Sequence, residues 1–119
     1  VVLPGYVDEA DKAALLSGAA GLVFPSLYEG FGFPVLEAMA CGTPVLCADT
    51  SSLPEVAGEA ALLVNPQDTA ALAAAMRRLT GDDALRRNWV EKGYTNLARF
   101  RWDKAAAQTL LVLEAAAGR

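Results

Sequence analysis

Short apolar runs and longer stretches with helical spacing follow one another along the chain. The apolar runs, which are typical of strands buried in a sheet, are residues 1–3, 22–24, 45–48 and 61–64. The remaining stretches predict helices at 8–18, 34–41, 53–57 and 68–79, another that begins at 82, and a last one at 102–117. Strands and helices that alternate through short connections predict an α/β fold, with a parallel sheet and helices on its faces.

Polar residues at the predicted helix starts support these boundaries. Asp8, Asp68 and Asp82 each stand where an N-cap is expected, and a carboxylate there accepts from the free N–H groups of the first turn. Ser52 and Glu55 have the spacing of a capping box, in which each side chain bonds to the backbone N–H of the other residue. Glu55 is therefore interpreted as part of a helix cap and not as a ligand.

The composition is that of one globular domain. The 119 residues suit a single domain, and 54% of them are hydrophobic, which excludes a disordered chain. A net charge of −4 and a pI near 4.7 give no basic surface for nucleic acid. Two cysteines are too few for a disulfide scaffold and fit small buried side chains in a reducing cytoplasm. No apolar run is long enough to span a bilayer, and the first residues show no signal-peptide pattern.

The chain contains no histidine, which removes the commonest general base and the commonest metal ligand. It also has no Asp-X-Asp motif, so neither a metal nor a cofactor is expected. Any chemistry must come from carboxylates, backbone dipoles or another part of a larger protein.

One segment holds most of the candidate chemistry, the sequence Glu-Gly-Phe-Gly-Phe-Pro-Val-Leu-Glu from Glu29 to Glu37. It leaves a predicted buried strand and enters a helix at Pro34, which places it at the carboxyl edge of the sheet, where ligands bind. Glycines let the backbone approach a ligand, and the free N–H groups of a helix start attract a phosphate. Two carboxylates beside a phosphate favour hydroxyl partners, so the pattern indicates a nucleotide-sugar site with hydroxyls on Glu29 and Glu37.

Simpler roles exist for the same residues. Glu37 complements the helix dipole even without a ligand, and Glu29 in a polar loop can be solvated. A strand-to-helix turn with glycines also occurs in flavodoxin-like signalling domains, but neither the Phe24 nor the Ala48 strand end supplies the acidic cluster that such domains need. A non-catalytic nucleotide-sugar-binding module is the other alternative to an enzyme.

The two glutamates, with seven residues between them, resemble the paired-glutamate motif of retaining glycosyltransferases with the GT-B fold, especially family 4 (glycosyl transferases group 1). Residues 24–45 are similar to that family nearly position by position, and the stretches 5–7, 53–56, 62–64 and 100–102 also fit. The resemblance covers the whole chain. It implies a Rossmann-like sheet that belongs to the C-terminal, nucleotide-sugar-binding domain of such an enzyme.

The resemblance also implies a role for each residue of the segment. Glu29, the catalytic candidate, contacts the donor hexose, and Glu37 binds the ribose hydroxyls of the nucleotide. The donor-binding residues between them form two groups. The first is Gly30, Phe31, Gly32 and Phe33, and the backbone amides of the last three approach the sugar and diphosphate. The second is Val35 and Leu36, which either form a wall near the ribose and base or belong to the core. Ser26 and Tyr28 are expected to shape the loop.

By the same resemblance, the intact enzyme would transfer a hexose from a UDP- or GDP-hexose to an acceptor hydroxyl with retention of configuration, in polysaccharide or glycoconjugate biosynthesis. No protein general base is needed, because the donor phosphate takes the acceptor proton. The expected location is the cytoplasm, and peripheral association of the intact enzyme with a membrane is left open.

Some parts of the family pattern differ or are absent. Residues 1–119 are expected to form one partial domain, because the family's C-terminal domain begins about two strands earlier. Those two strands carry the basic residues that bind the diphosphate. A separate N-terminal domain of the family binds the acceptor. Without those strands, strand 22–24 has an open edge, so the isolated chain is expected to form a homodimer, or else to close on itself with residues 1–3 beside that strand. Arg101 replaces the usual serine or threonine before the last helix, and Trp89 and Trp102 are expected in the core.

Overall fold

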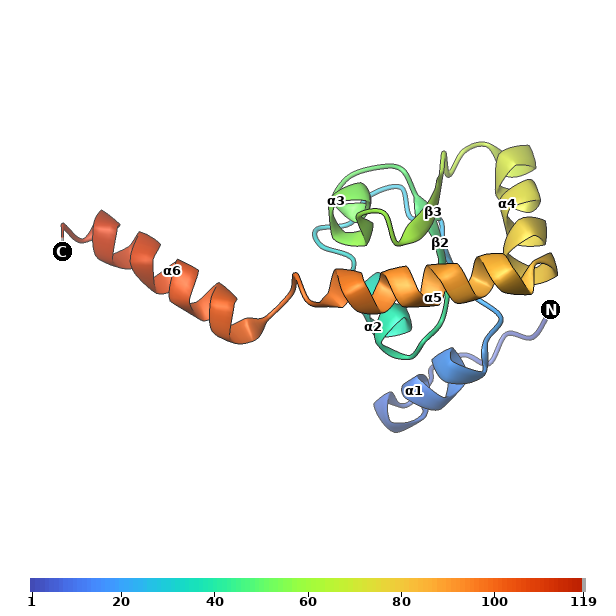
Figure 1. Ribbon diagram of the computed structural model, residues 1–119, viewed down its shortest axis with the longest axis horizontal. Coiled ribbons are helices and arrows are strands. Elements are labelled where there is room, and N and C mark those ends of the chain that lie inside the picture. Colours follow the sequence, from blue (N-terminus) through green and yellow to red (C-terminus); the bar gives the residue numbers. More distant parts are fainter. Residues whose placement is uncertain (119) are drawn as a thin grey trace.

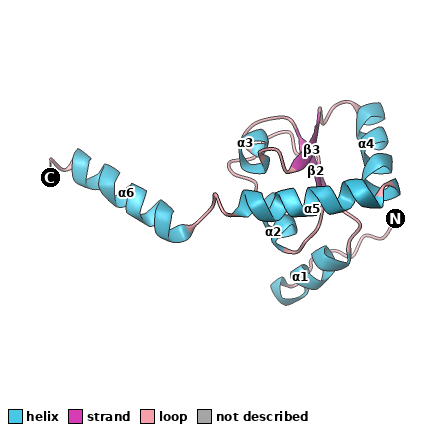
Figure 2. Ribbon diagram, viewed as in Figure 1, coloured by secondary structure: helices cyan, strands magenta, loops and turns pink. Residues whose placement is uncertain are grey.

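The computed structural model describes residues 1–118 and has an α/β architecture (Figures 1 and 2). Three parallel strands, β1 (Leu22–Phe24), β2 (Val45–Ala48) and β3 (Ala61–Val64), form one sheet in the order β1-β2-β3. Leu22 pairs with Val45, and Val45 pairs with Ala61, so the strands begin level with one another. The predicted fold class and these strands are confirmed.

Helices connect the strands and cover both faces of the sheet. The helices of the described residues are α1 (Glu9–Gly18), α2 (Phe33–Ala40), α3 (Leu53–Ala57), α4 (Thr69–Gly81), α5 (Asp83–Leu97) and α6 (Trp102–Ala116), of which α2, α3 and α4 pack against β2. Val45 and Cys47 of β2 pack in a cluster with α2 and α3, whereas Leu46 between them packs with Ala75 and Leu79 of α4. This alternation buries β2 on both faces, as a central parallel strand requires.

The N-terminal segment departs from the prediction. Residues 1–3 form no strand, and Val1, Val2 and Leu3 are exposed. Apolar, β-branched residues favour a strand only where a neighbouring strand takes up their backbone groups, and the segment has no such neighbour here. The alternative in which these residues close the sheet beside β1 is therefore wrong. β1 itself lies at one end of the sheet and is half-buried, not fully buried as expected.

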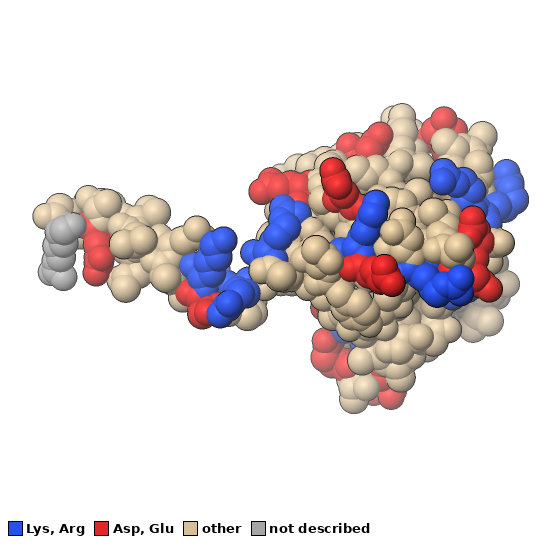
Figure 3. Space-filling view, in the orientation of Figure 1, with Lys and Arg blue, Asp and Glu red and all other residues tan. Residues whose placement is uncertain are grey.

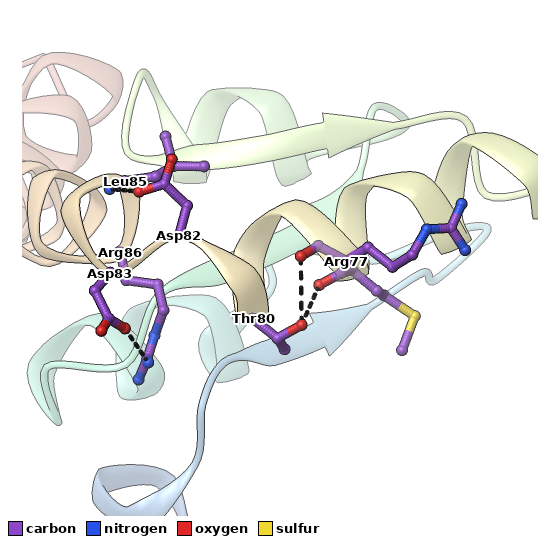
Figure 4. Close-up of polar contacts among 7 residues, drawn as sticks. Arg77, Thr80, Asp82, Asp83, Leu85 and Arg86 are labelled. Atoms are coloured by element: carbon purple, nitrogen blue, oxygen red, sulfur yellow. Dashed lines mark hydrogen bonds and ion pairs between the residues drawn. The ribbon is translucent and has the colours of Figure 1, made fainter.

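Two of the predicted helix caps are present. Asp68 Oδ1 accepts a hydrogen bond of 2.9 Å from the Ala71 N–H at the start of α4. Asp82 Oδ1 accepts one of 2.8 Å from the Leu85 N–H at the start of α5 (Figure 4). Asp8 occupies the N-cap position of α1 but makes no side-chain bond to it.

The capping box predicted at the start of α3 does not form. Ser52 is the N-cap residue, but its side chain makes no bond to the α3 backbone. Its φ and ψ of −78° and −14° are helical, whereas a residue that caps with its side chain has an extended backbone. The Ser52 hydroxyl instead donates to the loop that precedes α2, as described below.

Buried Asn96 of α5 ties together α2 and α3. Its Nδ2 donates to the Val56 carbonyl of α3 at 2.9 Å and lies 3.5 Å from the Met39 sulfur of α2. Its Oδ1 accepts from the Arg99 guanidinium at 2.7 Å. One turn earlier, a Cβ at Gly93 would lie 3.1 Å from Met39 Cγ, so glycine allows α5 to approach α2 closely. These contacts fix the C-terminal end of the site helix, α2.

Helix α6 extends away from the rest of the molecule and has no buried residue (Figure 1). Trp102 at its start is 81% exposed, so its predicted place in the core is wrong, whereas Trp89 packs partly buried against the α4 side. Arg101 is ion-paired with Asp103 and makes no cap. The radius of gyration of 16.4 Å exceeds the roughly 13.5 Å of a compact domain of this length. Within residues 1–118, no helix combines the length and apolar character needed to cross a membrane.

Candidate functional site

The segment between β1 and α2, residues 25–32, is called the glycine loop below. It follows the carboxyl end of β1 directly, and residues 49–52 follow the carboxyl end of β2 beside it. Because the two strands are parallel neighbours, both connections lie at the same edge of the sheet. This edge is where ligands bind in open α/β sheets, as the sequence indicated.

Gly32 determines how the glycine loop enters α2. It is the N-cap residue and has a left-handed backbone, with φ 103° and ψ 45°. A Cβ at this position would also lie 2.6 Å from Leu53 Cδ2, so both the conformation and the space require glycine. Glycine has no side chain to cap the helix, and Pro34 stands in the first turn. The start of α2 therefore carries no side-chain cap that would compete with an anion for its positive end.

Glu29 lies half-buried in the glycine loop and is hydrogen-bonded through both its side chain and its backbone. Its Oε1 accepts from the Ser26 hydroxyl at 2.8 Å, which also lies 3.2 Å from the Tyr28 carbonyl. Its backbone N–H donates to Ser51 Oγ at 3.0 Å, and its carbonyl accepts from Ser52 Oγ at 2.9 Å. Ser26 and Tyr28 thus help to shape the loop, as predicted. The contributions of Ser51 and Ser52 had no signal in the sequence.

Glu37 lies on α2 and forms an ion pair with α1. Lys12 Nζ is 3.0 Å from Glu37 Oε1 and 2.7 Å from Glu9 Oε1. The Lys12 and Glu37 side chains are each 36% exposed, so the pair stands at the surface. The pKa of Lys12 is raised above its ordinary value, mainly by its hydrogen bond to Glu9 and to a smaller extent by its hydrogen bond to Glu37. A 2.6 Å hydrogen bond from Thr43 Oγ1 to the Leu16 carbonyl anchors the end of α1 near this position.

The apolar residues of the segment divide into two groups. Phe31 and Phe33 are exposed at 38% and 51%, with ring centroids 4.7 Å apart, and Phe31 also meets Phe100 edge-on at 5.9 Å. Val35 and Leu36 are buried in the core cluster beneath the loop. The packing of these two supports the core interpretation of their side chains, and a contact with the nucleotide stays a prediction.

The cysteines and the acidic residues show no arrangement suited to a metal. Cys41 and Cys47 are free thiols, and burial raises the pKa of Cys47 to about 11, which keeps it protonated at neutral pH. In the part of the chain that the structure describes, no group of three or more acidic or cysteine side chains could hold a metal ion. Lysine, arginine, aspartate and glutamate side chains are intermixed over the face shown in Figure 3, which gives no continuous basic patch there.

The sequence places the chain among known proteins. The family model described as "Glycosyl transferases group 1" matches residues 1–96. The chain belongs to this family. The stretch it matches includes the glycine loop, Glu29 and Glu37.

Individual relatives agree with the family model. The chain is 42% identical over 106 residues to the O-antigen chain mannosyltransferase B of Escherichia coli, which covers 89% of this chain and 28% of that protein. It is 42% identical over 119 residues to an MMP alpha-(1->4)-mannosyltransferase of Mycolicibacterium hassiacum, covering 97% of this chain and 29% of that protein. The chain thus spans less than a third of the length of either relative.

A solved structure extends this similarity to three dimensions. The chain matches sucrose-phosphate synthase from Thermosynechococcus elongatus with a TM-score of 0.83 at 37% sequence identity. The match covers 97% of this chain and 30% of that one. The expected resemblance to glycosyltransferases of the GT-B fold is therefore confirmed.

Proposed function

We propose that this chain is the distal part of the nucleotide-sugar-binding domain of a family 4 glycosyltransferase. The intact enzyme transfers a hexose from a UDP- or GDP-hexose to an acceptor hydroxyl and retains the anomeric configuration. One observation carries the proposal: an uncapped helix start stands between two separately supported glutamates, Glu29 and Glu37. The cytoplasm is the proposed location, because both cysteines are free thiols, as is usual in a reducing compartment.

Each part of the site has its own task in this proposal. The positive end of α2 and the amides of Phe31, Gly32 and Phe33 stabilise the diphosphate as it becomes the leaving group. Glu29 binds a hydroxyl of the hexose, and Glu37 binds the ribose hydroxyls. The donor phosphate takes the acceptor proton, so the lack of histidine is no obstacle to catalysis. Mannose is the favoured hexose, because several relatives are named mannosyltransferases.

Calorimetry with GDP-mannose and UDP-glucose tests the proposal on the complete protein that carries this chain. One donor should bind with a micromolar Kd, and transfer to an acceptor should give a product with the anomeric configuration of the donor. Binding of neither donor would overturn the proposal. The 119 residues alone should transfer no sugar, because catalysis requires both substrates to be positioned and the acceptor domain lies outside them. Measurable sugar transfer by the purified 119-residue chain would contradict the proposal that a separate domain is needed to bind the acceptor.

We further propose that the isolated chain forms a homodimer, with exchange of strands as the favoured geometry. β1 is paired on one side only within the described residues, and open strand edges recruit other strands. Sedimentation equilibrium at micromolar concentration tests this. A mass near 12.5 kDa that does not depend on concentration would exclude the dimer.

A further inference from the structure

Three consecutive hydroxyl residues after β2 bind the glycine loop. Thr50 Oγ1 lies 3.3 Å from the carbonyl oxygens of both Ser26 and Leu27. Ser51 Oγ accepts from the Glu29 N–H at 3.0 Å. Ser52 Oγ lies 2.9 Å from the Glu29 carbonyl oxygen and 2.8 Å from the Phe31 carbonyl oxygen, and the two oxygens share its one hydroxyl hydrogen. Residues Thr50, Ser51 and Ser52 are called the hydroxyl clamp below.

The clamp forms hydrogen bonds with the backbone of Glu29 on both sides of its Cα atom. Ser51 binds the N–H that precedes the side chain, and Ser52 binds the C=O that follows it. With both peptide groups fixed, the direction of the Cα–Cβ bond is fixed as well, and Ser26 then fixes the carboxylate itself. These contacts order Glu29 before any ligand arrives, which reduces the entropy lost when a ligand binds.

Ser51 has an unusual backbone that agrees with this role. Its φ is 51°, which makes it the one non-glycine residue with a positive φ within residues 1–118. Residues other than glycine keep such a conformation only where their surroundings impose it, and these residues gather at functional sites. Glycine would adopt this backbone without strain, but it would provide no oxygen for the Glu29 N–H. The hydroxyl thus explains why a strained serine is present.

We propose that the hydroxyl clamp is a positioning device for Glu29 that sets the affinity of the site for the hexose part of the donor. The proposal rests on the proposed function of Glu29 as the hexose contact. Within the described residues, the clamp makes no hydrogen bond with Glu37, whose side chain pairs with Lys12 on a different element. Loss of the clamp should therefore weaken binding of a nucleotide sugar more than it weakens binding of the free nucleoside diphosphate.

The first test compares Ser52→Ala with Ser52→Thr in the complete protein. Alanine removes the donor to the loop, and threonine keeps a hydroxyl at the same place. Calorimetry is done with GDP-mannose or UDP-glucose, whichever donor the wild type binds. The Kd of Ser52→Ala for that donor should rise about tenfold, which corresponds to the loss of one to two hydrogen bonds. Because Ser52 also bonds the Phe31 carbonyl, the affinity of this variant for GDP or UDP should fall by a smaller factor than its affinity for the nucleotide sugar. Ser52→Thr should restore most of the sugar-dependent affinity.

The second test uses Ser51→Gly and Ser51→Ala, and it remains informative if Ser52→Ala fails to fold. Ser51→Gly removes the hydroxyl but relieves the backbone strain, so its melting temperature should stay close to that of the wild type. Its affinity for the nucleotide sugar should nevertheless fall about threefold or more. If Ser51 had only a structural role, a Ser51→Gly variant that kept its stability would also keep its affinity for the nucleotide sugar. Ser51→Ala keeps the strain and loses the hydroxyl, so it should lose both stability and affinity.

The outcomes separate this inference from the proposed function. If the wild type binds nucleotide sugar and the Ser51 and Ser52 variants bind it equally well, the inference is overturned and the proposed function stands. If nucleotide sugar and nucleoside diphosphate lose affinity by the same factor, the clamp has no specific link to the hexose, and the inference is again overturned. If the wild type binds neither donor, both fail together.

Discussion

Glu29 and Glu37 belong to one proposed site but are supported by different kinds of contact. Glu29 is held by neutral hydroxyls from its own loop and from the neighbouring connection, through both backbone and side chain. Glu37 stands on a helix and is held by one charge, the Lys12 ammonium of α1. The first arrangement depends on the positions of several atoms, whereas the second depends on the presence of an opposite charge.

This difference has consequences for how each carboxylate responds to its surroundings. Hydrogen bonds from hydroxyls are short-ranged and directional, so salt affects them little. A surface ion pair is screened by salt and disappears when one partner loses its charge. The hexose end of the site should therefore respond to small changes of shape, and the ribose end should respond to ionic strength and alkaline pH.

The largest expected effect comes from Glu29. Glu29→Gln keeps an oxygen that can accept from Ser26 but removes the charge offered to the hexose. In the complete enzyme, the transfer rate should fall about a hundredfold, a typical loss when a transition-state contact is removed. Affinity for the free nucleoside diphosphate should not change. Steady-state kinetics with the donor varied, together with calorimetry, would measure both, and a rate within a factor of a few of wild type would contradict the catalytic assignment.

A smaller loss, confined to binding, is expected at Glu37. Glu37→Gln should lower the affinity for nucleotide sugar and for nucleoside diphosphate alike by about tenfold or more, because a hydrogen bond to a charged group is lost. The melting temperature should move by only a few degrees, since the side chain is partly exposed and its ion pair with Lys12 stands at the surface. Unchanged affinity by calorimetry would remove the ribose role.

Lys12 should act through Glu37 and not on its own. Lys12→Met should weaken nucleoside diphosphate binding about threefold at low salt, and the loss should shrink as salt screens the pair. In the Glu37→Gln background the same substitution should have no further effect. Glu9→Gln is the matched control, because it removes the other partner of Lys12 and leaves Glu37 in contact. Equal losses in both backgrounds would show that Lys12 acts independently of Glu37.

The smallest effect is a pH dependence confined to the alkaline side. The pKa of Lys12 is raised in the folded protein, so its pairs are fully present below its ordinary value of 10.5 and are lost as pH rises through the higher folded value. The difference in melting temperature between wild type and Lys12→Met should be constant from about pH 6 to 9 and should shrink only above this range. Ionisation of Cys47, with a pKa of about 11, lowers the stability of both proteins and cancels in the comparison. A difference that vanished near neutral pH would contradict the assignment.

The features that could be predicted well from the sequence are those that depend on residues close together in the chain. The bounds of α3 and of all three strands agree with those expected, because apolar runs and turn residues act over a few positions. Residues 1–3 have the same local pattern but form no strand, since a strand also needs a partner. Trp102 likewise has the size of a core residue but lies on α6, which packs against nothing that could bury it.

The site was predicted in part for the same reason. Glu29 and Glu37 stand out because a short motif contains both, together with the glycines and Pro34. No signal in the sequence indicated the contacts of Ser51, Ser52 and Lys12 with the two glutamates, because each contact joins residues more than twenty positions apart. Ser52 even suggested a local role, in a capping box, that its hydroxyl does not perform.

The hydroxyl clamp also bears on the order in which the molecule can acquire its shape. Its hydrogen bonds join residues 21 to 24 positions apart, and β1, α2 and β2 all lie within or beside that span. The contacts that order the glycine loop therefore require β1 and β2 to be paired, and closing a segment of this length is a long-range step. A nascent chain that ends before residue 50 already contains both glutamates, yet it has not formed the site. Glu29 thus becomes competent through the assembly of a whole strand–helix–strand unit, and the motif alone is not sufficient.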